Sequence, residues 1–144
     1  MKIKTTRFGE ISIDEEKIIH MPYGMLGFPN ARQYIIFHHK PDSPFFWYQS
    51  VDDPALAFVI TSPFFLASDY HVDVEQVFKE MNWECPSKDH LELYVVVNIP
   101  KGSPEKMTAN LIGPVLINNT VRQAVQMVIS NSSYSHKHPL VEQH

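Results

Sequence analysis

The sequence has a single cysteine, no long apolar run and no cluster of basic residues, and these absences exclude several classes of protein. One thiol, Cys85, cannot form an intramolecular disulfide or supply a cysteine-rich zinc site. No apolar stretch approaches the roughly 20 residues that a membrane-spanning helix needs. The first residues, MKIKTTRFGE, lack the apolar core of a signal peptide. We therefore expect a cytoplasmic protein with no membrane segment.

The charges argue against nucleic acid as a direct ligand. The formal net charge is −4, and the Lys and Arg side chains are scattered along the chain, whereas contact with a phosphate backbone needs them grouped. A basic protein is an easier partner electrostatically. The chain is 44% hydrophobic and 19% charged over 144 residues, which is typical of one globular domain that buries a sizeable core.

Motifs for catalysis and metal binding are missing as well. The sequence contains no GxGxxG, GxxxxGK[ST] or HExxH pattern, and a lone cysteine is usually a small buried hydrophobe. His38 and His39 are adjacent, so on a strand they point to opposite faces. His136 and His138 would share a face, but no third ligand stands at a useful spacing. We expect neither an enzyme nor a protein with a metal or other cofactor.

A period of two residues dominates the chain and predicts β-strands. Short alternating or β-branched runs are separated by turn-forming Pro, Gly, Asp and Asn. The expected strands cover residues 2–8, 10–13, 17–21, 33–38, 45–51, 56–61, 90–99, 108–111, 115–118 and roughly 122–129. The spacing in the last range also fits a helix, and its β-branched content favours a strand. Many short strands with frequent turns are typical of an all-β barrel or sandwich.

One segment has the period of a helix. In residues 73–83, DVEQVFKEMNW, apolar residues recur at i, i+3, i+4 and i+7 from Val74. We expect Asp73 to be the N-cap, with Gln76 completing a pattern like a capping box. No linker or repeat divides the chain, so residues 1–130 form one domain, and the polar residues 131–144 are expected to be a flexible C-terminal tail.

The densest aromatic segment is PFFWYQSVDDPALAFVI, residues 44–60. It predicts a hairpin, because DDPA at residues 52–55 favours a turn and cannot continue a central strand. Alternation places Phe46 and Tyr48 on one face and their neighbours on the other. Only one face of a barrel wall is core, and we assign Phe46 and Tyr48 to it. The other face is then a candidate contact patch.

Several short motifs follow one another in the order of a known family. Tyr23–Phe28, YGMLGF, corresponds to a G-x-P-G-F turn with Leu26 in place of proline. Ala109–Asn118, ANLIGPVLIN, corresponds to A-N-L-x-A-P-I-x-I-N with Gly113 in place of the second alanine. Smaller matches at the expected spacing are Gln49-Ser50, Ala57-Phe58-Val59, Pro63-Phe64, Asp69-Tyr70, Gln126 and Tyr134. Over essentially residues 3–138 the chain resembles the family of the flagellar assembly factor FliW.

The resemblance implies a non-enzymatic bacterial protein with a compact antiparallel β-barrel-like fold. It also implies two alternative partners, flagellin and CsrA, a small basic RNA-binding protein that represses flagellin translation. A free FliW-like protein would bind CsrA and relieve repression, whereas accumulated flagellin would sequester it and release CsrA. On this reading there is no direct contact with nucleic acid, a membrane or a small-molecule substrate.

The residues expected to contact a partner are Tyr48, Asp52, Asp53, Asp69 and Tyr70. The two adjacent aspartates would either attract basic CsrA or only shape the turn. The motif positions expected to have a structural or functional role are Gly24, Gly27, Phe28, Gln49, Ser50, Asn110, Leu111, Pro114, Asn118, Gln126 and Tyr134. The alternative to a partner-binding protein is a small β-barrel that binds a ligand or catalyses a reaction in an open interior.

Overall fold

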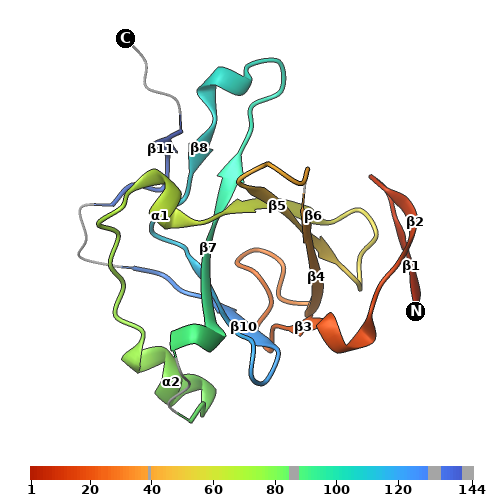
Figure 1. The fold of residues 1–144 in the computed structure, drawn as a ribbon, viewed down its shortest axis with the longest axis horizontal. Helices are drawn as coiled ribbons and strands as arrows, with labels where there is room; N and C mark the ends of the chain where they lie inside the picture. Colours follow the sequence, from red (N-terminus) through yellow and green to blue (C-terminus); the bar gives the residue numbers. More distant parts are fainter. Residues whose placement is uncertain (39, 85–87, 130–133, 141–144) are drawn as a thin grey trace.

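The computed structural model describes residues 1–38, 40–84, 88–129 and 134–140 and has a closed β-barrel at its centre (Figure 1). The strands are β1 (Lys2–Thr5), β2 (Gly9–Ser12), β3 (Ile19–His20), β4 (Gln33–His38), β5 (Phe45–Ser50), β6 (Ala57–Thr61), β7 (Leu91–Asn98), β8 (Thr108–Ala109), β9 (Val115–Asn118), β10 (Gln123–Gln126) and β11 (His138–Pro139). The α-helices are α1 (Pro63–Leu66) and α2 (Glu75–Met81), and short 3-10 turns lie at Glu15–Lys17, Lys88–His90 and Pro104–Lys106.

Within the described residues, seven strands form the barrel in the order β7–β6–β5–β4–β3–β10–β9, and β9 pairs back with β7. All pairs are antiparallel except β10 with β3, where Gln123 lies opposite His20. The eight-residue β7 closes the ring because its first half pairs with β9 and its second half pairs with β6 and β8. The predicted all-β, largely antiparallel barrel is confirmed.

The barrel interior is filled with side chains. Its buried members are Ile19, Met21, Met25, Ala31, Tyr34, Tyr48, Ile60, Val115, Ile117 and Ala124. At the centre, the rings of Tyr34 and Tyr48 stack with centroids 4.3 Å apart and planes 2° from parallel. Phe46 packs against the same cluster, so the assignment of Phe46 and Tyr48 to the core face agrees with the structure. A filled interior counts against the alternative of a ligand cavity inside the barrel.

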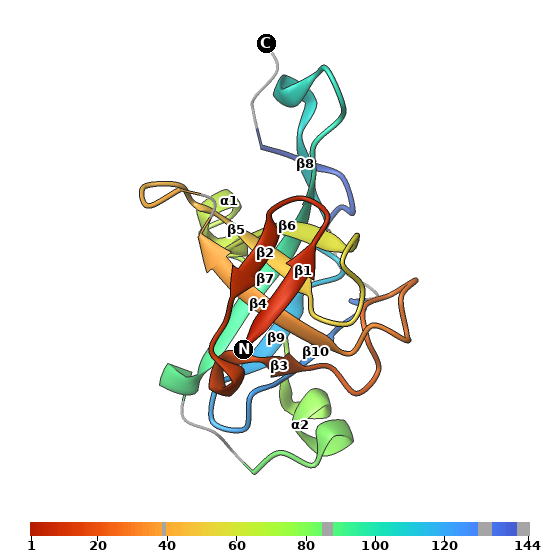
Figure 2. The ribbon, with the colours of Figure 1, turned by 90° about the vertical axis from the view of Figure 1, so that its right-hand side faces the viewer.

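The outer face of the aromatic hairpin is covered in part by the β1–β2 hairpin, which lies across β4 and β5 (Figure 2). The Phe8 ring makes edge contacts with Phe37 and Trp47, at centroid distances of 4.9 and 5.2 Å. The Arg7 guanidinium lies 4.7 Å from the centroid of the Trp47 ring. The patch expected on this face is therefore a packing surface for the N-terminal hairpin.

Two further apolar clusters lie outside the barrel. One forms under α2, where Val77 and Trp83 pack on Leu116 of β9. The other gathers Tyr70, Val95, Val97, Ala109 and Leu111. Residues 134–140, within the segment expected to be a flexible tail, lie against this second cluster. There β11 pairs with β8 and Leu111 N–H donates to the Ser135 carbonyl (2.9 Å). Residues 131–133 and 141–144 lie outside the described residues.

Helix α2 confirms the predicted helix, with one change at its start. The N-cap is Val74 rather than Asp73, and the Asp73 carboxylate accepts from Glu75 N–H (3.0 Å). Helix α1 was not predicted, because a single turn is too short to show a helical period. Its start is fixed locally by the Ser62 hydroxyl, which accepts from Phe64 N–H (3.2 Å). No helix that the structure describes is long and apolar enough to cross a membrane.

Buried tyrosines make the stability of the fold sensitive to alkaline pH. Burial, followed by the charges of Asp52 and Asp53, raises the pKa of Tyr34 from 10.0 to about 12. Burial also raises the pKa of Tyr48 well above its ordinary value. The folded state thus holds these protons more tightly than the unfolded chain, so the stabilisation is complete below about pH 10 and is lost as the pH rises above it. Urea unfolding across this range should show a falling free energy of unfolding, and a constant value up to about pH 11 would contradict the expectation.

Candidate protein-interaction site

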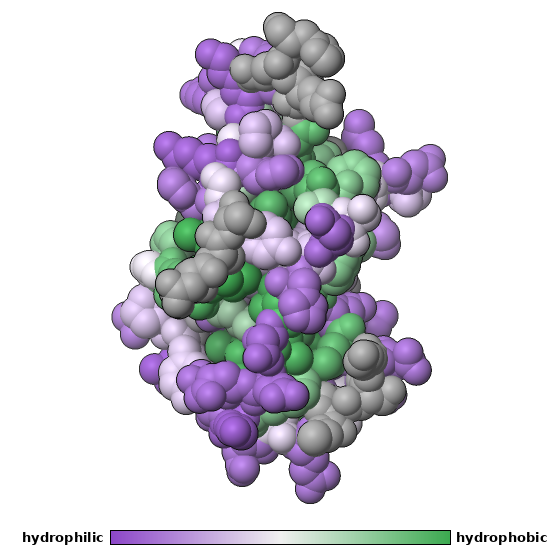
Figure 3. Space-filling model, turned by 90° about the vertical axis from the view of Figure 1, so that its left-hand side faces the viewer, coloured by the Kyte–Doolittle hydropathy of each residue, from purple (hydrophilic) through white to green (hydrophobic). Residues whose placement is uncertain are grey.

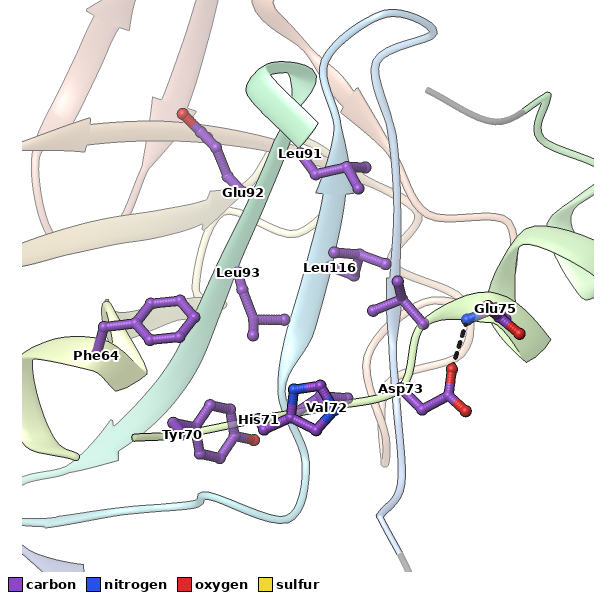
Figure 4. A pocket seen from close by; sticks show the side chains of 11 residues that line it. Phe64, Tyr70, His71, Val72, Asp73, Glu75, Leu91, Glu92, Leu93 and Leu116 are labelled. Carbon is purple, nitrogen blue, oxygen red and sulfur yellow. Dashed lines mark hydrogen bonds between the residues drawn. The ribbon is translucent and has the colours of Figure 1, made fainter. Parts of the chain in front are cut away.

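A groove of about 740 Å³ opens on the outer surface of the barrel between α1 and α2, and we call it the interaction groove. Its floor consists of Leu91 and Leu93 of β7 and Leu116 of β9. One wall is Phe64 of α1, and the other is the segment 70–75 that leads into α2 (Figure 4). Apolar side chains gather in the middle of the face that carries α1 and α2 and are bordered by hydrophilic ones (Figure 3).

Strand alternation explains why the floor is apolar on the outside of a barrel. On β7, Tyr94 and Val96 pack against the interior cluster, whereas Leu91 and Leu93 pack against the outer clusters. Since both faces of β7 carry apolar residues, the outer face needs cover. Helix α2 and the segment before it supply this cover only in part, and the interaction groove is the uncovered remainder.

The wall of the groove is held by two hydrogen bonds and a ring contact. The Tyr70 hydroxyl donates to the Leu111 carbonyl (2.6 Å), and the Tyr70 ring lies 4.6 Å from the Tyr134 ring between centroids. The Tyr134 hydroxyl accepts from His71 N–H (2.9 Å). These contacts fix the chain between α1 and α2 against the barrel. The groove is therefore a formed feature of the fold.

Helix α1 presents two phenylalanines to solvent beside the groove. The side chains of Phe64 and Phe65 are 51% and 60% exposed, although large aromatic residues are usually buried in a monomer. Phe64 also makes an edge contact with Tyr70 at a centroid distance of 6.1 Å. Because Ser62 caps this single turn and Pro63 begins it, the two rings are held on the surface. Exposed aromatic anchors of this kind are typical of protein-binding sites.

Carboxylates border the apolar floor. Asp73 and Glu75 are exposed on the α2 side, where the Asp73 carboxylate is hydrogen-bonded to Glu75 N–H (Figure 4). Glu92 lies at the β7 end with its carboxylate directed away from the leucines, and it accepts from the Tyr94 hydroxyl (3.3 Å). An apolar floor with a negatively charged rim favours a partner that is both apolar and basic.

Two of the residues expected to contact a partner are core residues. Tyr48 is 0% exposed inside the barrel, and Tyr70, the first residue of the segment that leads into α2, is 4% exposed in the cluster with Val95 and Leu111. Neither ring can be a surface anchor in this structure. Asp69, next to Tyr70, is exposed. Asp52 and Asp53 lie before the start of β6 and Asp69 lies beyond its end, so these carboxylates are at opposite ends of that strand.

Asp52 and Asp53 shape the turn after β5. The Asp52 carboxylate accepts from Arg32 N–H (2.7 Å) and Gln33 N–H (2.9 Å), which joins the turn to the start of β4. The Asp53 carboxylate accepts from Ala55 N–H (3.0 Å). These bonds favour the turn-shaping role over contact with a partner.

The buried residues Gln49 and Ser50 stabilise the same turn. The Gln49 side-chain amide donates to the carbonyls of Ser50 (2.9 Å) and Leu56 (3.1 Å). The Ser50 hydroxyl accepts from Asp53 N–H (2.9 Å). Both polar side chains therefore satisfy backbone groups, as buried polar groups must.

Other motif residues converge on the loop of residues 21–31. The Gln126 amide accepts from Leu26 N–H (2.8 Å) and donates to the Gly113 carbonyl (3.0 Å), so it ties the loop to the ANLIGP motif. The Asn110 side chain accepts from Ile112 N–H (3.1 Å) within that motif. Phe28 makes an edge contact with Phe58 at 5.6 Å between centroids. The loop exposes Tyr23 (65%), Leu26 (57%) and Phe28 (42%), and we call these three residues the loop surface.

The remaining motif positions are structural in this fold. Gly24 and Gly27 have positive φ angles of 66° and 88°. Leu111 is buried, the Pro114 carbonyl accepts from Met127 N–H (2.7 Å), and the Asn118 side chain accepts from Thr120 N–H (3.0 Å). Of the histidines considered as ligands, His39 lies outside the described residues. No three His, Cys, Asp or Glu side chains among those described are placed to hold one metal ion.

Sequence reasoning missed most of the interaction groove, since its residues come from three separate segments. The usable signal was the aromatic pair Phe64-Phe65 directly after Ser62-Pro63, since serine is a common N-cap and proline a common first residue of a helix. Leu91 and Leu93 gave a weaker signal, as alternate apolar residues on a strand whose other face is also apolar.

Comparisons with known proteins agree with one another. The sequence profile of the FliW protein family matches residues 2–140. A protein of Magnetococcus marinus named flagellar assembly factor FliW is 40% identical over 141 residues, which cover 98% of this chain and 85% of the relative. A protein of the same name from Alkaliphilus metalliredigens is 40% identical over 146 residues, covering 99% and 88%. A crystal structure of the flagellar assembly factor FliW superposes with a TM-score of 0.87 at 31% identity, covering 99% of this chain and 98% of the other.

Proposed function

The chain belongs to the family of the flagellar assembly factor FliW, and from that premise we propose that it binds flagellin and, alternatively, the translational regulator CsrA. Binding to CsrA relieves the repression of flagellin translation. Binding to newly made flagellin occupies the protein and leaves CsrA free to repress. The proposal places the protein in the cytoplasm, where unexported flagellin and CsrA are both present, and it requires no catalytic step and no cofactor.

The interaction groove is the observation that carries this proposal. A partner switch needs a preformed surface with a few strong anchors. The exposed Phe64 and Phe65 beside an apolar floor supply anchors, and the carboxylates of Asp73 and Glu75 suit a basic protein such as CsrA. Inhibition of CsrA by this surface does not require imitation of RNA, since the chain has no dense array of phosphate-like charges.

Competition between the two purified partners tests the proposed function. Fluorescently labelled CsrA should bind the protein, and unlabelled flagellin should displace it in a saturable manner. In a cell-free system that translates a flagellin message, CsrA should lower the yield, the protein should restore it, and added flagellin should cancel the restoration. A protein that binds neither partner, or that binds both without competition, would contradict the proposal.

A further inference from the structure

We propose that the interaction groove is the docking site for a basic amphipathic segment of a partner protein. The inference rests on the proposed function, in which the basic partner is CsrA, and it assigns one surface of the chain to that partner.

The negative charge of the chain is concentrated in residues 69–92, of which three carboxylates, Asp73, Glu75 and Glu92, line the groove. Residues 69–92 have seven carboxylates against two lysines, a net charge of −5, whereas the whole chain has −4. The carboxylates are Asp69, Asp73, Glu75, Glu80, Glu84, Asp89 and Glu92. Since the other 120 residues carry a net +1 by difference, the acidity of this protein is a local property of the α2 region. Such a field speeds the encounter with a basic partner.

The apolar part of the groove requires a partner that also brings apolar side chains. Leu91, Leu93 and Leu116 form a floor on two adjacent antiparallel strands, and Phe64 stands at its edge. A floor of this kind, walled on one side by a helix and on the other by the segment before the next helix, fits the apolar face of an amphipathic helix or strand. Basic residues on the flanks of that face would lie near Asp73 and Glu75.

The loop surface provides the contrast. It also exposes aromatic residues, but residues 21–31 include no Asp, Glu, Lys or Arg. The cleft next to Phe28 is lined by Asp52 and Asp53, and both carboxylates accept hydrogen bonds from backbone N–H groups of the turn and of the start of β4. A basic partner therefore gains more from charge complementarity at the interaction groove than at the loop surface. This difference favours the groove as the site of the basic partner.

The test measures the binding kinetics of CsrA and of flagellin for matched pairs of variants. Phe64→Ala removes an exposed anchor of the groove, and Tyr23→Ala removes a similarly exposed ring of the loop surface. Glu75→Lys reverses a charge at the groove, and Glu16→Lys makes the same change in an exposed 3-10 turn elsewhere. All four side chains are exposed, so we expect the variants to unfold at nearly the wild-type temperature.

We expect Phe64→Ala to weaken CsrA binding about thirty-fold, mainly through faster dissociation. Glu75→Lys should slow CsrA association about ten-fold at low salt, with the difference shrinking as salt is added. Tyr23→Ala and Glu16→Lys should leave CsrA binding within about two-fold of wild type.

The outcomes separate the inference from the proposed function. If the wild-type protein binds both partners and the groove variants still bind CsrA normally, the assignment of the groove is overturned while the proposed function stands. A loss of CsrA binding in Tyr23→Ala or Glu16→Lys as large as in the matched groove variant also overturns the assignment. If the wild-type protein binds neither partner, the proposed function fails and the assignment fails with it.

Discussion

Replacing Gly24 by alanine is expected to lower the free energy of unfolding by about 3 kcal/mol. Gly24 has a φ of 66°, in the left-handed region that side chains disfavour. A Cβ at this position would lie 2.4 Å from the Phe28 carbonyl oxygen, 2.9 Å from the Pro29 Cα and 3.1 Å from the Ala31 carbonyl oxygen. All three atoms belong to the backbone, so the clash can be relieved only by moving the loop.

Gly102→Ala is the matched control for this effect. Gly102 has a φ of 80°, but a Cβ there would meet no atom within 4 Å. The control thus retains the strain of the left-handed backbone without the clash, and should cost only about 1 kcal/mol. Urea unfolding of the two variants measures both values. Equal losses of stability would show that the backbone around residues 28–31 is not packed against Gly24.

Movement of this loop should also be visible locally. The Leu26 N–H is held by the Gln126 side chain, so its exchange with solvent deuterium should accelerate in Gly24→Ala. The amides of α2, on another side of the barrel, should exchange as in wild type after correction for the change in global stability. An unchanged exchange rate of the Leu26 amide would show that the strain caused by Gly24→Ala lies outside the loop.

The strands could be predicted where alternation and turn residues coincide. β4 (Gln33–His38) and β9 (Val115–Asn118) have the predicted bounds, because turn-forming residues lie close to both ends of each. The bounds of the strand at Gln123–Gln126 were less clear, because its spacing also fits a helix. The β-branched residues in this region favoured a strand, and the structure shows one.

Barrel closure could not be read from the same pattern. It depends on the pairing of β7 with β9 and of β3 with β10, which join residues far apart in sequence. Strand periodicity carries no information about which strands pair. The barrel was predicted from the family motifs instead. In the structure these motifs are neighbours, because Gln126 is hydrogen-bonded both to Gly113 and to Leu26 in the loop.

The candidate site was harder to predict than the fold because burial of an aromatic residue depends on what covers it. Tyr48, which was assigned to the core face, and Tyr70 were both named as partner contacts, and both are core. Phe64 belongs to the Pro63-Phe64 motif match and Phe65 belongs to no motif match. Both side chains are exposed. The sequence segments around these four aromatic residues are similarly apolar. Which rings remain exposed to a partner therefore depends on where α1, α2 and the β1–β2 hairpin lie.

Tyr48→Ala is expected to lower the free energy of unfolding by about 3–5 kcal/mol, since it removes a fully buried ring from the centre of the barrel. The ring stacks on Tyr34 at a centroid distance of 4.3 Å, so its removal leaves a cavity beside Tyr34 in the packed interior. A Tyr23→Ala control at an exposed ring should change stability by less than about 0.5 kcal/mol. A small loss for Tyr48→Ala would contradict the core position of this residue.

Tyr48→Phe should have the opposite sign. Among the residues that the structure describes, the buried Tyr48 hydroxyl has no hydrogen-bond partner, and burying such a group without a partner costs free energy. Removing the oxygen while keeping the ring should therefore raise the free energy of unfolding by about 1 kcal/mol. Because burial raises the pKa of Tyr48, the phenylalanine variant should also lose stability less steeply above pH 10. A loss of stability at neutral pH in Tyr48→Phe would mean that the hydroxyl makes a stabilising bond in solution, and the centre of the barrel would then be held by polar contact as well as by packing.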